Sequence, residues 1–114
     1  MKTYRFVAFS IAKPGREAEL ETWYDNRHIP DCLRLDGFVA AQRFRIHQAP
    51  LGTQVPQWQF MVIYDIETDD IDATLAQIGQ LARTPAMPIT DALDMSTSLR
   101  LVGEAVTQRF VSQL

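Results

Sequence analysis

The sequence predicts one α+β domain that spans residues 1–114, in which a four-stranded antiparallel sheet carries two helices on one face. Two observations lead to this fold class. Four segments are rich in branched and aromatic residues, as strands are, and two others repeat apolar residues every three or four positions, as amphipathic helices do. With 114 residues, the chain has room for one hydrophobic core and is too short for two domains.

The chain begins with a predicted strand and a predicted helix. The aromatic and branched run at 3–12 predicts a strand that ends at a Pro-Gly pair. Beyond that pair, Leu20, Tyr24 and His28 follow one another at intervals of four residues, which places them on one stripe of a helix. We expect this helix to end at or before Ile29, because a residue that precedes proline is displaced from helical geometry.

Two further strands follow an Asp-Gly turn. Residues 38–47 alternate between apolar and polar side chains, and residues 57–67 form the most apolar strand of the chain. The loop between them contains Pro50, Gly52 and Pro56. The two strands therefore predict a hairpin with a long connection.

The last predicted elements are a helix and a strand. Residues 69–83 carry apolar side chains along one face, with Asp69 or Asp70 as the candidate N-cap. A strand is predicted near 95–106. The resulting order, β-α-β-β-α-β, is that of the ferredoxin-like split βαβ unit.

One face of this sheet is expected to be neither a dry core nor an ordinary wet surface. In 57–67 one alternating set is wholly apolar and belongs under the helices, whereas the other contains Met61. On the neighbouring strand the matching set combines Val39 with Arg43 and Arg45. Such a face is too apolar for water and too polar for a dry core. We therefore predict a homodimer, in which a second copy covers this face and leaves a polar-lined cavity.

Composition excludes several classes of partner. The chain has 11 basic and 14 acidic residues, for a net charge of -3, and its basic residues are scattered, so nucleic-acid binding is not expected. No apolar stretch approaches the roughly 18 residues of a membrane span. The single cysteine, Cys32, excludes an internal disulfide and favours a cytoplasmic location. We expect Cys32 to be a small buried residue and not a nucleophile.

His28 is the candidate functional residue, since it shares the inner stripe of the first helix. Asp25 lies three residues earlier, and a nearby carboxylate and a helix C-terminus both favour the protonated imidazole, which suits general acid-base catalysis. The alternative is a histidine that only satisfies a backbone carbonyl. Tyr24 is either a core residue or a cavity neighbour, and Asp31 is either a cavity neighbour or a helix cap. No metal-ligand spacing is present, and no metal is expected.

The stretch at 23–45, WYDNRHIPDCLRLDGFVAAQRFR, resembles the EthD-like members of the dimeric α/β-barrel superfamily. In these proteins a helix ending in a W-Y-x-x-x-H-[LI]-P-type motif runs into a P/D-G-F turn and an alternating strand. The resemblance implies a ferredoxin-like protomer whose sheet pairs with a second copy to close a barrel. It also implies proton transfer at His28, with Asp25 orienting the ring and with Tyr24 and Asp31 beside the cavity.

The leading functional hypothesis is a small-molecule enzyme of the isomerase, lyase or hydrolase type that needs no cofactor. Its substrate would be a hydrophobic cyclic or carboxylated metabolite. Arg43 and Arg45 are candidates for binding a substrate carboxylate, with Met61 on the same face, although two strand arginines can also serve solubility. Two alternatives stay open: a non-enzymatic, ligand-binding or stress-responsive barrel, and a monooxygenase, with or without haem, of the same superfamily.

Overall fold

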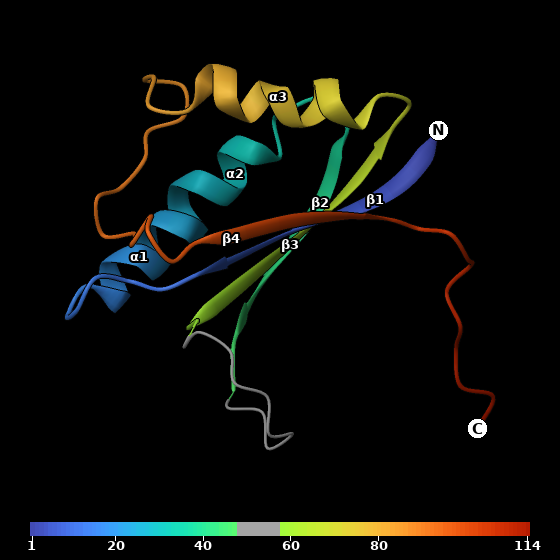
Figure 1. Ribbon diagram of the computed structural model, residues 1–114, viewed down its shortest axis with the longest axis horizontal. Coiled ribbons are helices and arrows are strands. Elements are labelled where there is room, and N and C mark those ends of the chain that lie inside the picture. The colour runs from blue at the N-terminus through green and yellow to red at the C-terminus, as the bar shows by residue number, and fades with distance from the viewer. Residues whose placement is uncertain (48–57) are drawn as a thin grey trace.

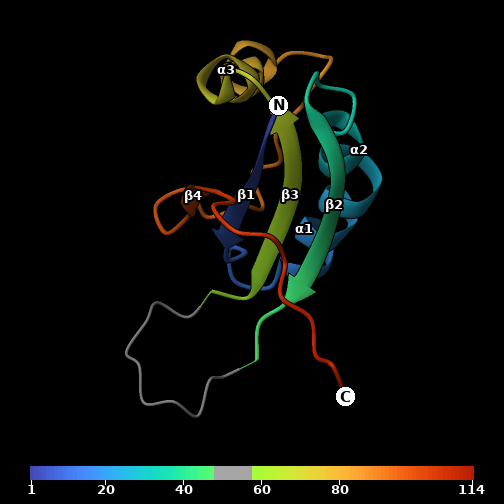
Figure 2. The same cartoon turned by 90° about the vertical axis from the view of Figure 1, so that its right-hand side faces the viewer.

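The computed structural model describes residues 1–47 and 58–114, so the loop predicted around Pro50, Gly52 and Pro56 lies outside the described residues. Its four strands form one sheet in the order β2-β3-β1-β4, with every neighbouring pair antiparallel (Figure 1, Figure 2). The strands are β1 (Lys2–Ser10), β2 (Phe38–Arg45), β3 (Phe60–Thr68) and β4 (Leu99–Glu104). This confirms the predicted ferredoxin-like α+β fold.

Two helical segments cover one face of the sheet. The first is a continuous run made of α1 (Glu17–Trp23), the π-helical turn η1 (Tyr24–His28) and α2 (Ile29–Cys32). The second is α3 (Ile71–Leu81), which crosses the same face (Figure 1). As predicted, an aspartate caps α3, because the Asp70 carboxylate accepts a hydrogen bond from the Ala73 backbone N–H at 3.1 Å.

The first helix does not end before Pro30, so that prediction was wrong. In η1 the Ile29 N–H bonds to the Tyr24 carbonyl, five residues back, instead of four. A proline inside an α-helix normally clashes with the carbonyl four residues earlier. The wider turn just before Pro30 relieves this crowding, and the helix continues to Cys32.

Strand β2 contains a bulge that changes which side chains face the helices. Phe38 lies opposite Ile66, but Ala40 lies opposite Asp65, so one residue is left over between them. Beyond the bulge, Arg43 and Arg45 face the helices, together with the apolar set of β3. The prediction that these arginines share a face with Met61 was therefore wrong.

The core lies between the helices and the sheet. It is built around fully buried side chains from both layers, such as Leu20, Cys32, Val62, Tyr64 and Ile66. The face turned away from the helices is also strongly apolar, and its side chains include Val7, Phe9, Phe44, Met61, Ile63, Leu99 and Leu101. Leu99 is 41% exposed and Leu101 is 48% exposed.

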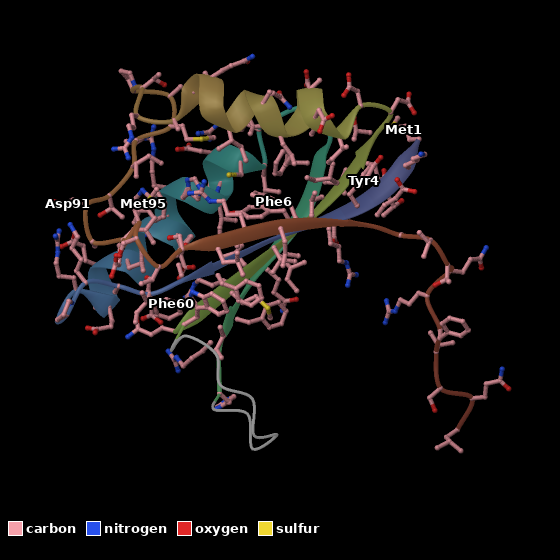
Figure 3. All side chains as sticks on the ribbon, in the orientation of Figure 1. Met1, Tyr4, Phe6, Phe60, Asp91 and Met95 are labelled. Carbon is pink, nitrogen blue, oxygen red and sulfur yellow. The ribbon has the colours of Figure 1, made fainter. Side chains whose placement is uncertain are left out.

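The residues that follow β4 extend away from the sheet as a tail (Figure 3). The tail carries apolar side chains, of which Phe110 is 88% exposed and Val111 is 70% exposed. Among the described residues, no helix is long and apolar enough to cross a membrane.

Candidate functional site

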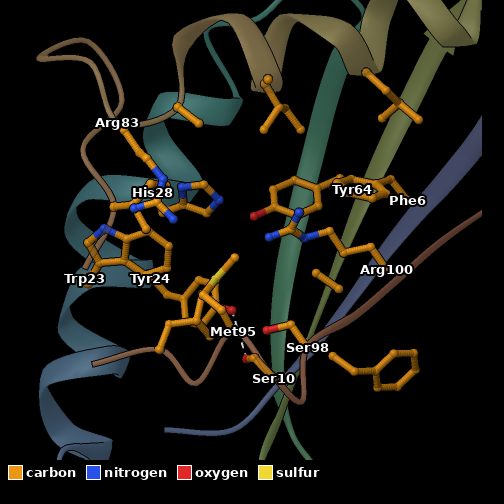
Figure 4. A pocket seen from close by; sticks show the side chains of 18 residues that line it. Phe6, Ser10, Trp23, Tyr24, His28, Tyr64, Arg83, Met95, Ser98 and Arg100 are labelled. Atoms are coloured by element: carbon orange, nitrogen blue, oxygen red, sulfur yellow. Dashed lines mark hydrogen bonds between the residues drawn. The ribbon is translucent and has the colours of Figure 1, made fainter. Parts of the chain in front are cut away.

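A cavity of about 360 Å³ lies between the sheet and the helices, next to His28 (Figure 4). Its walls come from both layers: Phe6 and Ser10 on β1, Tyr64 on β3, Trp23, Tyr24 and His28 on the first helix, Ile78 on α3, and Arg100 on β4. From the sequence, the cavity is expected on the mixed face, under a second subunit. The cavity that contains His28 lies instead on the helix-covered face of a single protomer.

The π-turn sets the position of His28. Residues five apart are separated by about 140° around an α-helix of 3.6 residues per turn, whereas a π-turn brings them to the same side. As a result, the His28 ring stacks on Trp23, with centroids 4.3 Å apart and an interplanar angle of 15°. The Trp23 indole N–H donates to the Pro88 carbonyl at 3.0 Å, which holds the indole in place.

One ring nitrogen of His28 is occupied and the other is not. Nε2 lies 3.7 Å from the Sγ of Cys32, whereas Nδ1 is buried and has no hydrogen-bond partner among the described residues. Cys32 is fully buried, as predicted, and burial raises the pKa of its thiol to about 11. The Cys32 side chain therefore supports the imidazole as a neutral thiol.

The charge state of His28 is opposite to the expected one. Burial, and then the nearby Arg100 cation, lower the pKa of His28 to about 4, while the Asp31 carboxylate acts in the opposite direction. The imidazole is thus neutral near pH 7. The prediction of a favoured imidazolium was wrong, because burial outweighs the neighbouring carboxylate.

Asp25, expected to orient His28, has a different partner. Arg43 donates to both oxygens of this carboxylate, at 2.8 and 2.9 Å, and this pairing lowers the pKa of Asp25. Arg43 and Arg45 also both donate to Glu21, each at 3.2 Å. The two arginines predicted to bind a substrate carboxylate therefore tie β2 to the first helix, and they do not line the cavity that contains His28.

Asp31 and Met61 also lie away from this cavity. Asp31 is 3% exposed and is paired with Arg27, at 2.9 Å, and with Arg34. Met61 lies opposite Phe9 in the sheet register, on the face turned away from the helices. Of the residues chosen from the sequence, His28 and Tyr24 line the cavity.

Tyr24 is held in the cavity wall by β1. Its hydroxyl donates to the Ser10 Oγ at 2.8 Å, and both residues are buried. Burial raises the pKa of Tyr24, so its hydroxyl stays protonated. Tyr24 was predicted to be either a core residue or a cavity neighbour, and in the structure it is both.

The cavity residues that were missed from the sequence include Tyr64, Arg83 and Arg100. The Tyr64 hydroxyl is buried and has no hydrogen-bond partner among the described residues, and Figure 4 shows it pointing into the cavity. Arg100 faces the helices because it lies opposite Ala8 of β1. In the sequence, the only signal for Arg100 is that it is the lone arginine in the apolar run Leu-Arg-Leu-Val. The sheet face on which its side chain lies depends on the strand register.

The cavity thus combines apolar walls with a few polar groups of defined chemistry. A neutral imidazole with an unpaired nitrogen can accept or donate a proton, a buried phenol can donate a hydrogen bond, and guanidinium groups can hold an anion. Within residues 1–47 and 58–114, no group of three His, Cys, Asp or Glu side chains is placed to hold a metal ion. The arrangement suits a small, mainly apolar molecule with one polar or charged end.

Fold and site together define a ferredoxin-like α+β domain with a ligand-sized cavity under its helices. Solved structures of this fold match nearly the whole chain. An ethyl tert-butyl ether D (EthD) family protein from Bacillus halodurans is 16% identical, covers 93% of this chain and 100% of its own, and has a TM-score of 0.53. A proposed monooxygenase from Shewanella loihica is 11% identical, covers 95% of this chain and 99% of its own, and has a TM-score of 0.58.

A third similar structure is a protein of unknown function from Nitrosomonas europaea, which is 18% identical, covers 97% of this chain and 95% of its own, and has a TM-score of 0.52. No protein-family model matches this chain, and no curated protein sequence matches it. At these identities the likeness establishes a shared fold. The chain has the fold of the EthD-like proteins, as the resemblance of residues 23–45 implied.

Proposed function

We propose that this protein is a small-molecule enzyme that moves a proton between His28 and a hydrophobic ligand bound in the cavity. The observation that carries the proposal is the buried, unpartnered Nδ1 of His28, in a ring held by Trp23 and Cys32 at the cavity wall. A buried polar atom without a partner is costly in a purely structural site. A bound substrate would supply the missing hydrogen bond.

The neutral imidazole would act first as a base. His28 Nδ1 would take a proton from a C–H bond next to a carbonyl, and the electron pair would move onto the carbonyl oxygen as an enolate. The Tyr64 hydroxyl lines the same cavity and would donate a hydrogen bond to that oxygen. Returning the proton to a different carbon gives an isomerisation, and expelling a leaving group gives an elimination. Neither route requires a cofactor.

Asp31 would support the protonated intermediate without touching the substrate. Its carboxylate is buried and favours the imidazolium form of His28. The enolate would act in the same direction, because a nearby negative charge raises the pKa of histidine. The enolate and Asp31 would thus both stabilise the protonated His28 once the proton has moved.

Proton exchange with solvent tests this proposal directly. The wild-type protein is incubated in deuterium oxide with a panel of unsaturated lactones and cyclic keto acids, and loss of C–H signals is followed by NMR. We expect exchange with at least one compound, and a loss of about a hundredfold or more in His28→Gln. His47→Asn is the matched control, because this exposed histidine lies outside the cavity. Equal exchange rates in wild type and His28→Gln would exclude the proton-transfer role.

We further propose that the enzyme works as a homodimer. The sheet face turned away from the helices carries a row of apolar side chains, including Leu99 and Leu101, which a second copy of the same face would cover. Light scattering at micromolar concentration should give twice the monomer mass. A monomer under those conditions contradicts this part of the proposal.

A monooxygenase is the second candidate, since a proposed monooxygenase is among the similar structures. Its turnover would depend on dissolved oxygen, whereas proton transfer at His28 would not. Repeating the exchange assay under argon separates the two reactions. A protein that only sequesters its ligand would bind the compounds without exchanging their protons.

A further inference from the structure

We propose that Arg83 and Arg100 form a cationic clamp that selects a hydrophobic carboxylate as the ligand of the cavity. This inference rests on the proposed function, because it names the substrate class of the same site. It assigns carboxylate binding to a pair of arginines that the sequence patterns did not single out. The clamp would lie on the helix-covered face, away from Arg43 and Arg45.

The first observation is that these two arginines lack a carboxylate partner. Most arginines of the chain are paired with Asp or Glu: Arg5, Arg16, Arg27, Arg34, Arg43 and Arg45. Among the described residues, no carboxylate oxygen forms an ion pair with Arg83 or Arg100, and the remaining residues, 48–57, contain no Asp or Glu. Two cations beside an apolar cavity thus have no counter-charge from their own chain.

The second observation is the backbone conformation of Arg83. Arg83 follows α3 with a φ of 67°, the one positive φ at a non-glycine position among the described residues. Glycine adopts this conformation more readily than arginine does. The turn is closed by hydrogen bonds, since the Arg83 N–H donates to the Met87 carbonyl at 3.0 Å and the Thr84 N–H donates to the Leu81 carbonyl at 3.0 Å. This strained turn places a long cationic side chain at the rim of the cavity (Figure 4).

The third observation is the set of groups that face Arg100 in the cavity. The Tyr64 side chain is 1% exposed, and its hydroxyl has no hydrogen-bond partner among the described residues. Figure 4 shows the Tyr64 hydroxyl and the Arg100 guanidinium both directed into the cavity. Burial raises the pKa of Tyr64, so its hydroxyl stays protonated and can donate a hydrogen bond. A carboxylate could accept from the Arg100 guanidinium beside this phenol.

The apolar part of the ligand also has a defined place. Phe6, Trp23 and Ile78 line the same cavity, so an aromatic or cyclic body would pack there while its carboxylate meets the arginines. The cavity volume of about 360 Å³ accommodates a molecule of one or two rings. The site therefore matches an amphipathic anion better than a neutral hydrocarbon.

Calorimetry with a matched pair of probes tests the clamp. Cinnamate and cinnamamide have nearly the same shape, but only cinnamate is charged. We expect the wild-type protein to bind cinnamate about tenfold more tightly than cinnamamide, because a charge-assisted pair is stronger than a neutral hydrogen bond. Arg83→Gln and Arg100→Gln should each reduce this preference severalfold, and the double variant should abolish it. Arg5→Gln is the control, since Arg5 pairs with Asp65 on the opposite face of the sheet.

Arg83→Gly provides a second variant for which folding is not in question, because glycine suits the positive φ at this position. It should lose charge preference to the same extent as Arg83→Gln, with a melting temperature equal to or above that of the wild type. Equal binding of the two probes by the wild type overturns the clamp. So does the absence of saturable cinnamate binding at millimolar concentration, or a preference that survives in the double variant. None of these measurements needs turnover. The clamp can therefore be contradicted while proton transfer at His28 is supported, and proton transfer can be contradicted while the clamp is supported.

Discussion

The rings of Trp23 and His28 stack face to face, at a centroid distance of 4.3 Å, although five residues separate them along one helix. An α-helix would point these side chains in different directions, and the π-turn η1 brings them together. His28 lines the cavity, and its Nδ1 is buried. A local irregularity of one turn thus creates the feature on which the proposed chemistry depends.

The stability of the protein should depend on the protonation of His28. The pKa of this residue is lowered from 6.5 in the unfolded chain to about 4 in the folded protein, so the unfolded state binds more protons between these values. The free energy of unfolding should therefore be largest above about pH 6.5 and fall as the pH decreases toward 4, by up to about 3 kcal/mol. Urea denaturation across this range measures the effect.

His28→Gln is the variant that isolates this contribution. Its unfolding free energy should change much less between about pH 6.5 and pH 4 than that of the wild type. The lowered pKa values of Asp25 and Asp91 affect stability only as the pH falls below their ordinary value of 3.8, so they lie outside this range. Parallel curves for wild type and variant would contradict a buried, neutral His28.

Removing the charge of Arg100 should make His28 easier to protonate. Burial is the larger cause of the lowered pKa of His28 and the Arg100 guanidinium is the next, so Arg100→Gln should raise this pKa but leave it below 6.5. NMR titration of the imidazole protons measures it, with His47→Asn used to assign the two histidines. Arg5→Gln, on the other face of the sheet, should leave the His28 titration unchanged. A fall in the pKa in Arg100→Gln would contradict the placement of this side chain in the cavity.

Asp31 should matter for stability more than for ligand binding. Its carboxylate is 3% exposed and accepts hydrogen bonds from Arg27 and Arg34, so Asp31→Asn should cost about 1 to 3 kcal/mol. The exposed pair of Asp91 with Arg16 offers a matched control, and Asp91→Asn should have little effect. Thermal denaturation compares the two variants. An Asp31→Asn protein as stable as the wild type would show that this pair contributes no net stability.

Two glycines should respond to alanine in opposite directions. Gly37 has a φ of +91°, and an added Cβ would lie 3.0 Å from the Thr74 Cγ2. Thr74 cannot move easily, because its hydroxyl bonds to Thr68 at 2.7 Å and to the Asp70 carbonyl at 2.9 Å. Gly37→Ala should therefore cost about 2 kcal/mol or more.

Gly79 is the favourable counterpart, because it lies inside α3 with no atom within 4 Å of an added Cβ. Gly79→Ala should stabilise the protein by about 0.5 to 1 kcal/mol, since alanine has the higher helix propensity. Urea unfolding of both variants gives the two values. A change of the same sign in both would show that helix propensity and the positive φ do not dominate at these positions.

Short-range patterns were sufficient to predict the fold. Period-two and period-four apolar repeats located the four strands, the start of the first helix and α3, and the capping aspartate of α3 was one of two candidates before an apolar helix. The same spacing identified His28 and Tyr24, and both line the cavity. These patterns are local, because each depends on which side chains share one face of a single element.

The residues around the site depended on irregularities that no periodic pattern contains. One extra residue in β2 turned Arg43 and Arg45 toward the helix carboxylates, and one wide turn in the first helix stacked His28 on Trp23. A shift of one residue moves every following side chain to the other face of a strand. Periodicity alone does not reveal such shifts, since they are decided by how the elements pack.

The sequence by itself determined the order of elements and the helix stripe that carries His28. Only the tertiary structure decided which charges meet. Asp25 pairs with Arg43 of another element, while Arg83 and Arg100 are left facing the cavity. The physical reason is that an ion pair depends on distances across the fold, between residues up to tens of positions apart, whereas secondary structure depends mainly on neighbours within a few positions.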